Sequence, residues 1–148
     1  DAAARQSHTT HAAPAAVDAC VAFARMLADA IAGRPLAEIL GDPGFKLSGA
    51  IGDIVTGSWR AKPRSSITSS GYVTHSLEAA LWSVGRSASY REAVLTAANL
   101  GDDADTTAAI AGQLAGAVWG ASGIPARWRE QVAWGDRIID MAERLLAD

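Results

Sequence analysis

The sequence predicts an all-α protein, and three observations support that prediction. Alanine accounts for 33 of the 148 residues, and alanine favours the helix more than any other residue and lets helices approach closely. Apolar residues recur at intervals of three and four positions, which is the period of a helix that buries one face. No segment shows a convincing alternation of apolar and polar residues, the pattern of a half-buried strand.

Residues 1–11 are small and polar, and we expect them to form a loop. Pro14 then opens a helix, because proline suits a first helical turn, and Gly33 and Pro35 end it after Ile31. Its apolar residues predict a core-facing side, with Ala22 on the opposite, polar side. The residues predicted to face the core are Val17, Cys20, Val21, Ala24, Leu27, Ala28 and Ile31.

The middle of the chain shows weaker helix signals. Residues 36–40 predict a short helical turn, and residues 49–57 favour a helix weakened by glycine. Residues 60–71 are rich in Ser, Lys, Arg and Pro, the composition of an exposed loop, and ligand contacts concentrate on such loops. We expect Thr74 or Ser76 to cap the helix that follows.

The C-terminal half contains the clearest helix signals. Ser89 and Glu92 form a capping box at the start of a helix that ends near Asn99. Residues 104–120 predict the longest helix after it. Pro125 starts another helix, and Gly135 separates that one from a final amphipathic helix.

Composition excludes several classes of function. The length fits one domain, and 49% hydrophobic with 20% charged residues is typical of a globular chain. A net charge of −3 without a basic run argues against a nucleic-acid partner. No apolar run approaches the roughly 18 residues of a membrane span, so we expect a soluble, cytoplasmic protein. The single cysteine, Cys20, cannot form an intrachain disulfide, and we expect it to be a buried structural thiol.

The turn at residues 101–107, Gly-Asp-Asp-Ala-Asp-Thr-Thr, holds the candidate chemistry. Its three carboxylates repel one another unless positive charge compensates them, and a helix N-terminus supplies part of that charge. A hard cation such as Mg²⁺ or Mn²⁺ would supply the rest, because it binds carboxylate and hydroxyl oxygens. Asp103, Asp105 and Thr106 can converge on one ion. On spacing alone, ordinary helix capping by Asp or Thr is the more frequent explanation.

The helix after this turn places Ala108, Gly112, Gly116 and Gly120 four residues apart. Each interior glycine costs about 1 kcal/mol relative to alanine. We therefore expect another helix to approach this face closely, and we predict a central, buried helix whose N-terminus presents the acidic turn.

Two blocks of the sequence resemble the ADP-ribosylglycohydrolase family, which includes the dinitrogenase-reductase-activating glycohydrolases. They are GYVTHSLEAALW at 71–82 and NLGDDADT at 99–106, the latter continuing to residue 120. Both stand in the order and at about the spacing of the family. Thr10 and His11, followed by the helix from Pro14, are also similar to a middle segment of the family.

The resemblance implies an orthogonal multi-helix bundle, of which residues 1–148 would be the C-terminal half of one domain. It implies a hydrolase that cleaves the glycosidic bond between ADP-ribose and a protein side chain, most simply arginine, with two Mg²⁺ or Mn²⁺ ions. Asp102 would not be a ligand, but would either support the ligands from behind or face solvent. The implied metal ligands are Asp103, Asp105 and Thr106, with both aspartates also activating water, and the implied substrate contacts are His11, Gly71 and Tyr72.

The chain also departs from the family. The second acidic ligand set of the family, of Thr-Asp-Asp type, and its N-terminal Gly-Asp segment are absent from these 148 residues. The implied partners are therefore the missing N-terminal half and an ADP-ribosylated protein or an ADP-ribose-containing small molecule. Two alternatives stay open, namely a non-catalytic module that binds ADP-ribose or a nucleotide, and a structural use of the fold as in related lens crystallins. The intact D-x-D-T disfavours the structural use.

Overall fold

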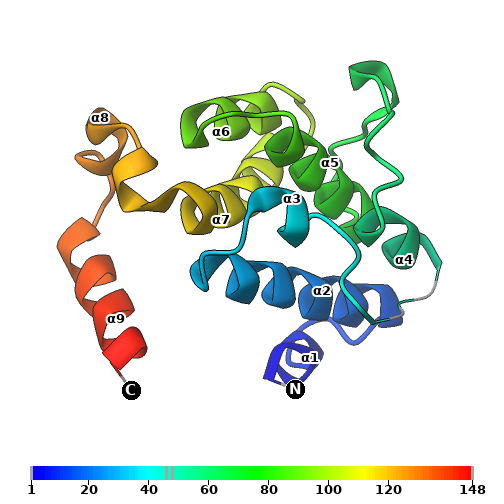
Figure 1. The fold of residues 1–148 in the computed structure, drawn as a ribbon, viewed down its shortest axis with the longest axis horizontal. Helices are drawn as coiled ribbons and strands as arrows, with labels where there is room; N and C mark the ends of the chain where they lie inside the picture. Colours follow the sequence, from blue (N-terminus) through cyan, green and yellow to red (C-terminus); the bar gives the residue numbers. More distant parts are fainter. Residues whose placement is uncertain (1, 46, 48, 148) are drawn as a thin grey trace.

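The computed structural model describes residues 2–45, 47 and 49–147, and all regular structure in this part of the chain is helical (Figure 1). The prediction of an all-α fold is confirmed. The helices are α1 (Ala2–His8), α2 (Pro14–Ile31), α3 (Leu36–Ile39), α4 (Gly49–Val55), the 3-10 turn η1 (Arg64–Ser66), α5 (Val73–Gly85), α6 (Tyr90–Ala98), α7 (Ala104–Gly123), α8 (Ala126–Arg129) and α9 (Gly135–Ala147).

Helices α5 and α7 form the centre of the bundle. Every residue of α5 from Ser76 to Val84 is buried, because α2, α4, α6 and α7 surround this helix. α7 packs against α2, α5 and α6, and it buries Thr107 together with Leu114. The predicted central position of α7 is confirmed, although α5 is buried on more sides.

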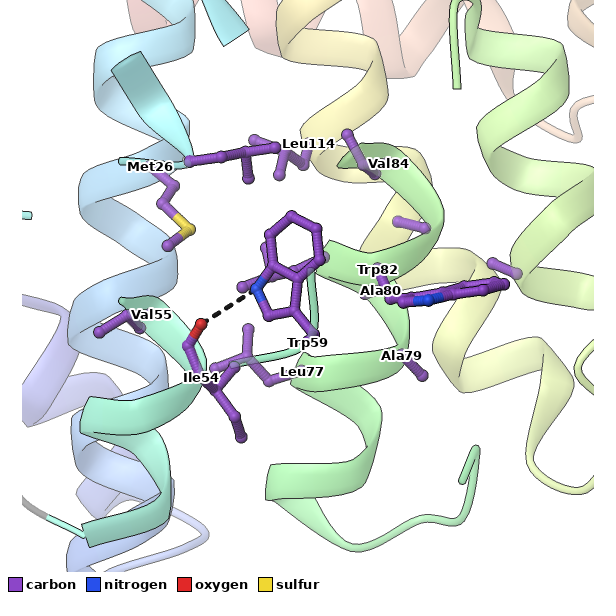
Figure 2. Close-up of a cluster of buried hydrophobic side chains, with 14 of the residues drawn as sticks. Met26, Ile54, Val55, Trp59, Leu77, Ala79, Ala80, Trp82, Val84 and Leu114 are labelled. Atoms are coloured by element: carbon purple, nitrogen blue, oxygen red, sulfur yellow. Dashed lines mark hydrogen bonds between the residues drawn. The ribbon is translucent and has the colours of Figure 1, made fainter. Parts of the chain in front are cut away.

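Trp59, which follows α4, packs among several helices of the bundle. Figure 2 shows the Trp59 ring among side chains of α2, α4, α5 and α7, including Met26 and Leu77. The ring is 3% exposed, and its indole N–H donates to the carbonyl oxygen of Ile54 over 3.0 Å. Burial of the ring therefore leaves no unsatisfied polar atom on this side chain.

The glycine face of α7 faces α6, as predicted, but the expected close approach at these glycines is not found. A methyl group added at Gly112 would lie 3.5 Å from the Tyr90 hydroxyl, and one at Gly116 would lie 3.8 Å from the Tyr90 ring. Gly120 does not continue this face, because its backbone has φ +70° and breaks the helix into two segments. Absence of a side chain at Gly120 therefore permits a kink rather than a close helix contact.

The predicted orientation of α2 was wrong. Its buried residues are Ala19, Ala22, Met26 and Ala30, whereas Ile31 is 65% exposed. Ala22, which was expected on the polar side, is 1% exposed. Three of these four buried residues are alanines, and α2 contacts both α5 and α7. Small side chains of this kind permit close packing between helices.

An exposed ion cluster lies at the C-terminal end of α2. The carboxylate of Asp29 lies 3.0 Å from Arg25 and 3.4 Å from Arg34. Desolvation alone would raise the pKa of Asp29, but hydrogen bonds and charge from the two arginines outweigh it and lower that pKa.

Two further predictions about helix ends were wrong, and one is confirmed. Residues 1–11 are not a loop throughout, because α1 occupies most of them. The N-cap position of α5 is Tyr72 rather than Thr74 or Ser76. At α6, the Ser89 side chain accepts the N–H of Glu92 as the capping box predicts.

Helix α9 lies apart from the bundle, at the end of the chain in Figure 1. None of its described residues is buried, and its apolar residues Ile138, Met141 and Leu145 are 54%, 49% and 73% exposed. Throughout the described ranges, every helix is too short or too polar to cross a membrane.

Candidate functional site

The acidic turn lies at the start of α7, with Asp103 at the N-cap position. The Asp103 carboxylate makes no capping hydrogen bond to the backbone of α7. The Asp103 carbonyl oxygen instead accepts the N–H of Thr107 over 3.1 Å. Capping therefore does not account for the carboxylate at this position, which leaves its oxygens available to another ligand.

The neighbouring acids differ in exposure. Asp103 is half-buried, whereas Asp102, Asp105 and Thr106 are exposed. Asp102 has φ +54°, a left-handed conformation that Asp tolerates better than most residues. Among the described residues, no three His, Cys, Asp or Glu side chains group closely enough to hold an ion. The three aspartates therefore do not form a three-carboxylate site by themselves.

The end of the predicted loop lies against this turn, and the structure corrects the expectation that residues 60–71 are exposed throughout. We call residues 67–71 the serine segment. Ser69 is 3% exposed, and its carbonyl oxygen accepts the N–H of Asp103 over 2.8 Å. The hydroxyl groups of Ser69 and Thr107 share a buried hydrogen bond of 2.8 Å. A methyl group on Gly71 would lie 2.9 Å from Oδ2 of Asp103.

Beside the turn lies a cavity of about 340 Å³ between α1, α2, α5 and α7. It brings together His11, Gly71 and Thr106, three of the residues predicted for the site, from three separate segments. Asp103, Asp105 and Tyr72 are not part of its lining. Its other polar residues are Gln6, Ser7, Thr10, Ser76 and Gln113, and its wall is completed by Ala16, Ala19, Cys20, Phe23, Val73, Leu77 and Ile110.

Cys20 differs from the expectation for it, whereas the substrate contact predicted for Tyr72 stays a prediction. Cys20 is half-buried and faces the cavity, so it is not the fully buried thiol expected from its helix position. Tyr72 is 61% exposed, and its ring meets the His75 ring edge to face at 5.5 Å. Tyr72 is thus at the surface, one residue away from the cavity lining.

Sequence reasoning missed three polar residues that form hydrogen bonds at the turn or in the serine segment. Ser69 and Thr107 join the segment to the turn, and the Nδ1 atom of His75 lies 2.8 Å from the hydroxyl oxygen of Ser70. The pair of serines directly before Gly71 was the available signal. Loop composition explains these serines equally well, because a hydrogen bond between residues 38 positions apart leaves no local pattern in the sequence.

A family model for ADP-ribosylglycohydrolases matches residues 1–148, which is the whole chain. The chain belongs to the ADP-ribosylglycohydrolase family.

Curated relatives and a solved structure agree with this membership. The chain is 46% identical over 140 residues to the ADP-ribosylarginine hydrolase Tri1 of Pseudomonas putida (strain GB-1), a match that covers 95% of this chain. It is 39% identical over 140 residues to the protein of the same name from Serratia proteamaculans (strain 568). A solved structure titled ADP-ribosylglycohydrolase-related protein complex matches with a TM-score of 0.82 and 35% identity, over 90% of this chain.

These matches cover only part of the relatives. The chain spans 38% of each of the two Tri1 proteins and 47% of the chain in the solved structure. Any property that depends on the whole length of a relative is therefore a proposal for this chain.

Proposed function

We propose that this chain is the C-terminal part of a domain that hydrolyses the bond between ADP-ribose and an arginine side chain. The main support is the state of the Asp103 carboxylate, which sits at a helix N-terminus without capping it. A structural aspartate at this position would be expected to cap the helix. The names of the two Tri1 relatives favour arginine as the modified residue.

In this proposal, Asp103, Asp105 and Thr106 hold one divalent ion. Their donor atoms are two carboxylates and a hydroxyl, which are the hard oxygen ligands that Mg²⁺ and Mn²⁺ prefer. Gly71 is consistent with this arrangement, because its missing side chain leaves room for the Asp103 carboxylate. A second ion of the complete enzyme would take its ligands from the missing N-terminal part. The bound ions would supply Lewis acidity at the ribose hydroxyls and lower the pKa of a bound water.

The residues of this chain would then act on water and on the substrate. The carboxylates of Asp103 and Asp105 orient a water molecule and accept a proton as its oxygen bonds to the anomeric carbon of the ribose. The bond from that carbon to the arginine nitrogen breaks, and the departing guanidino group takes up a proton. His11 and Gly71 contact ADP-ribose from the cavity side, and Tyr72 contacts it from the surface.

A second candidate is a module that binds ADP-ribose or a nucleotide without cleaving it. The observation that favours this candidate is the lack, among the described residues, of any group of three His, Cys, Asp or Glu side chains that could hold an ion unaided. The two candidates differ in turnover by the complete protein, which only the hydrolase performs.

Thermal unfolding with and without metal tests the site. An ion that binds only the folded state stabilises it by RT ln(1 + [L]/Kd), so Mg²⁺ or Mn²⁺ should raise the melting temperature. Asp105→Asn should abolish this rise. Asp102→Asn is the matched control, because it removes a neighbouring charge and Asn tolerates a left-handed backbone; it should leave the rise intact.

Activity of the complete protein tests the reaction. Replacing both Asp103 and Asp105 by Ala should stop ADP-ribose release from an arginine-modified protein, while circular dichroism shows an intact helical fold. The 148-residue chain alone should show little or no turnover. Brisk hydrolysis by that chain, or a complete protein indifferent to the double substitution, would refute the proposed function.

A further inference from the structure

We propose that Ser69 is the positioning residue for Asp103, setting where the first turn of α7 and its carboxylate lie. This inference rests on the proposed function, since it assumes that Asp103 is a metal ligand. Nothing in the local sequence of α7 specifies the contact, because Ser69 precedes Asp103 by more than thirty residues.

Ser69 contacts the acidic turn through two different groups. Its backbone carbonyl oxygen accepts the N–H of Asp103 over 2.8 Å. Its hydroxyl group shares a 2.8 Å hydrogen bond with the hydroxyl of Thr107. Ser69 therefore contacts the D-x-D-T turn at two points. One is Asp103, the first proposed ligand, and the other is Thr107, which directly follows the last proposed ligand, Thr106.

Burial makes the hydroxyl pair a strong constraint. Ser69 is 3% exposed and Thr107 is 0% exposed. Water cannot readily replace either partner at such a site, and a buried hydroxyl without a partner is unfavourable. The two hydroxyls therefore keep the serine segment and the first turn of α7 in one register.

The serine segment is itself held by α5, because the Ser76 hydroxyl donates to the carbonyl oxygen of Ser70 over 2.9 Å. Just before the segment, the Arg64 guanidinium of η1 donates to the carbonyl oxygen of Leu100 over 2.6 Å. This second hydrogen bond joins the chain that leads into the serine segment to the chain that leads into the acidic turn.

The Asp103 carboxylate depends on this support more than a capping residue would. A capping side chain is oriented by the N–H groups of its own helix, and Asp103 lacks that hydrogen bond. Its place is set by its backbone and by the space at Gly71. Residues that orient a metal ligand typically change metal affinity by roughly 10–100-fold when they are replaced.

Mn²⁺ binding by the complete protein tests the proposal, with free Mn²⁺ measured from its paramagnetic resonance signal. Ser69→Ala and Thr107→Val should each weaken Mn²⁺ binding by roughly 10–100-fold, and the double variant should weaken it no more than one of them does. Thr107→Ser, which keeps the hydroxyl, should bind Mn²⁺ like the parent. Should Ser69→Ala fail to fold, Thr107→Val makes the same test with little change of volume.

Ser83→Ala is the matched control. Ser83 is 0% exposed and donates to the carbonyl oxygen of Ala79 over 2.8 Å, within α5 and away from the turn. It should lose stability as the Ser69 variant does, but keep the Mn²⁺ affinity of the parent. Equal loss of affinity in Ser83→Ala and Ser69→Ala would assign the effect to general destabilisation and overturn the inference.

The remaining outcomes separate the inference from the proposed function. Parent-like Mn²⁺ affinity in Ser69→Ala, with binding lost in Asp103→Ala, would overturn the role of Ser69 and leave the metal site standing. Mn²⁺ affinity unaffected by Asp103→Ala would overturn the proposed site, and the inference with it.

Discussion

Replacing Gly71 by Ala is a small change that should weaken metal binding without lowering the stability of the metal-free protein. The new methyl carbon would lie 2.9 Å from Oδ2 and 3.8 Å from Cγ of Asp103. The backbone itself should accept alanine, because Gly71 does not have the positive φ that requires glycine. The atom in the way is the end of a side chain, so the Asp103 carboxylate should move rather than the fold.

The size of the movement follows from contact distances. A carbon–oxygen contact in proteins is ordinarily about 3.3–3.6 Å, so the carboxylate oxygen should withdraw by about half an ångström. Metal–ligand distances are held to about 0.2 Å. We therefore expect Mn²⁺ affinity to fall by roughly 10–100-fold, which corresponds to about 1.4–2.8 kcal/mol.

Without metal, the Gly71→Ala protein should be as stable as the parent or slightly more stable. Replacing glycine by alanine at a compatible position stabilises a protein by about 0.4–1 kcal/mol, because the unfolded chain loses freedom. Thermal unfolding of the parent and of Gly71→Ala, each with and without Mn²⁺, measures both effects. The expected result is an equal or higher melting temperature without metal and a smaller rise on adding Mn²⁺.

Gly112→Ala is the matched control for this experiment. Its methyl group would meet the Tyr90 hydroxyl at 3.5 Å, an ordinary contact on the side of α7 that faces α6. It should leave the Mn²⁺ response intact. A Gly71→Ala protein with the full Mn²⁺ response of the parent would show that Asp103 does not need the space at Gly71, and the reasoning would fail.

Three further outcomes are expected from the packing and the charges. Gly116→Leu should lower the free energy of unfolding, measured by urea denaturation, by about 1–3 kcal/mol, because the larger side chain overpacks against Tyr90. Gly116→Ala should not lower it, because its methyl group would lie 3.8 Å from that ring. Equal stability of the Leu variant and the parent would contradict the α6–α7 contact. Ser89→Ala should lower the free energy of unfolding by about 1 kcal/mol through loss of the N-cap, and no change would mean that the capping box is not formed in solution. The lowered pKa of Asp29 stabilises the fold above the ordinary value of 3.8, and this contribution disappears as the pH falls through the folded-state pKa. Asp29→Asn should therefore weaken the protein at neutral pH but not in strong acid, and equal weakening in both would contradict the ion cluster.

The helices could largely be predicted from the sequence, but the buried face of α2 could not. Pro14 and Gly33 bound this helix by local backbone preferences, which act within a few residues. The face that it buries depends on the neighbours available to it. Ala22 is buried whereas the larger and more hydrophobic Ile31 is exposed, so the hydrophobic pattern alone gave the wrong side.

The candidate site, too, could be predicted only in part from the sequence. The residues of the acidic turn and the family that they indicate were evident from the order of side chains along the chain. Whether Asp103 caps its helix was not, because capping and metal binding require the same residue types at the same spacing. Only the structure shows a carboxylate that makes no capping hydrogen bond.

The sequence by itself therefore determined the helical class, most helix boundaries, the acidic turn and the family, all of which depend on nearby residues or on motif order. The tertiary structure decided that His11, Gly71 and Thr106 line one cavity and that Ser69 reaches Thr107. The physical reason is distance along the chain. A hydrogen bond across 38 residues forms only after several helices have packed, so neither partner reveals the other in the sequence.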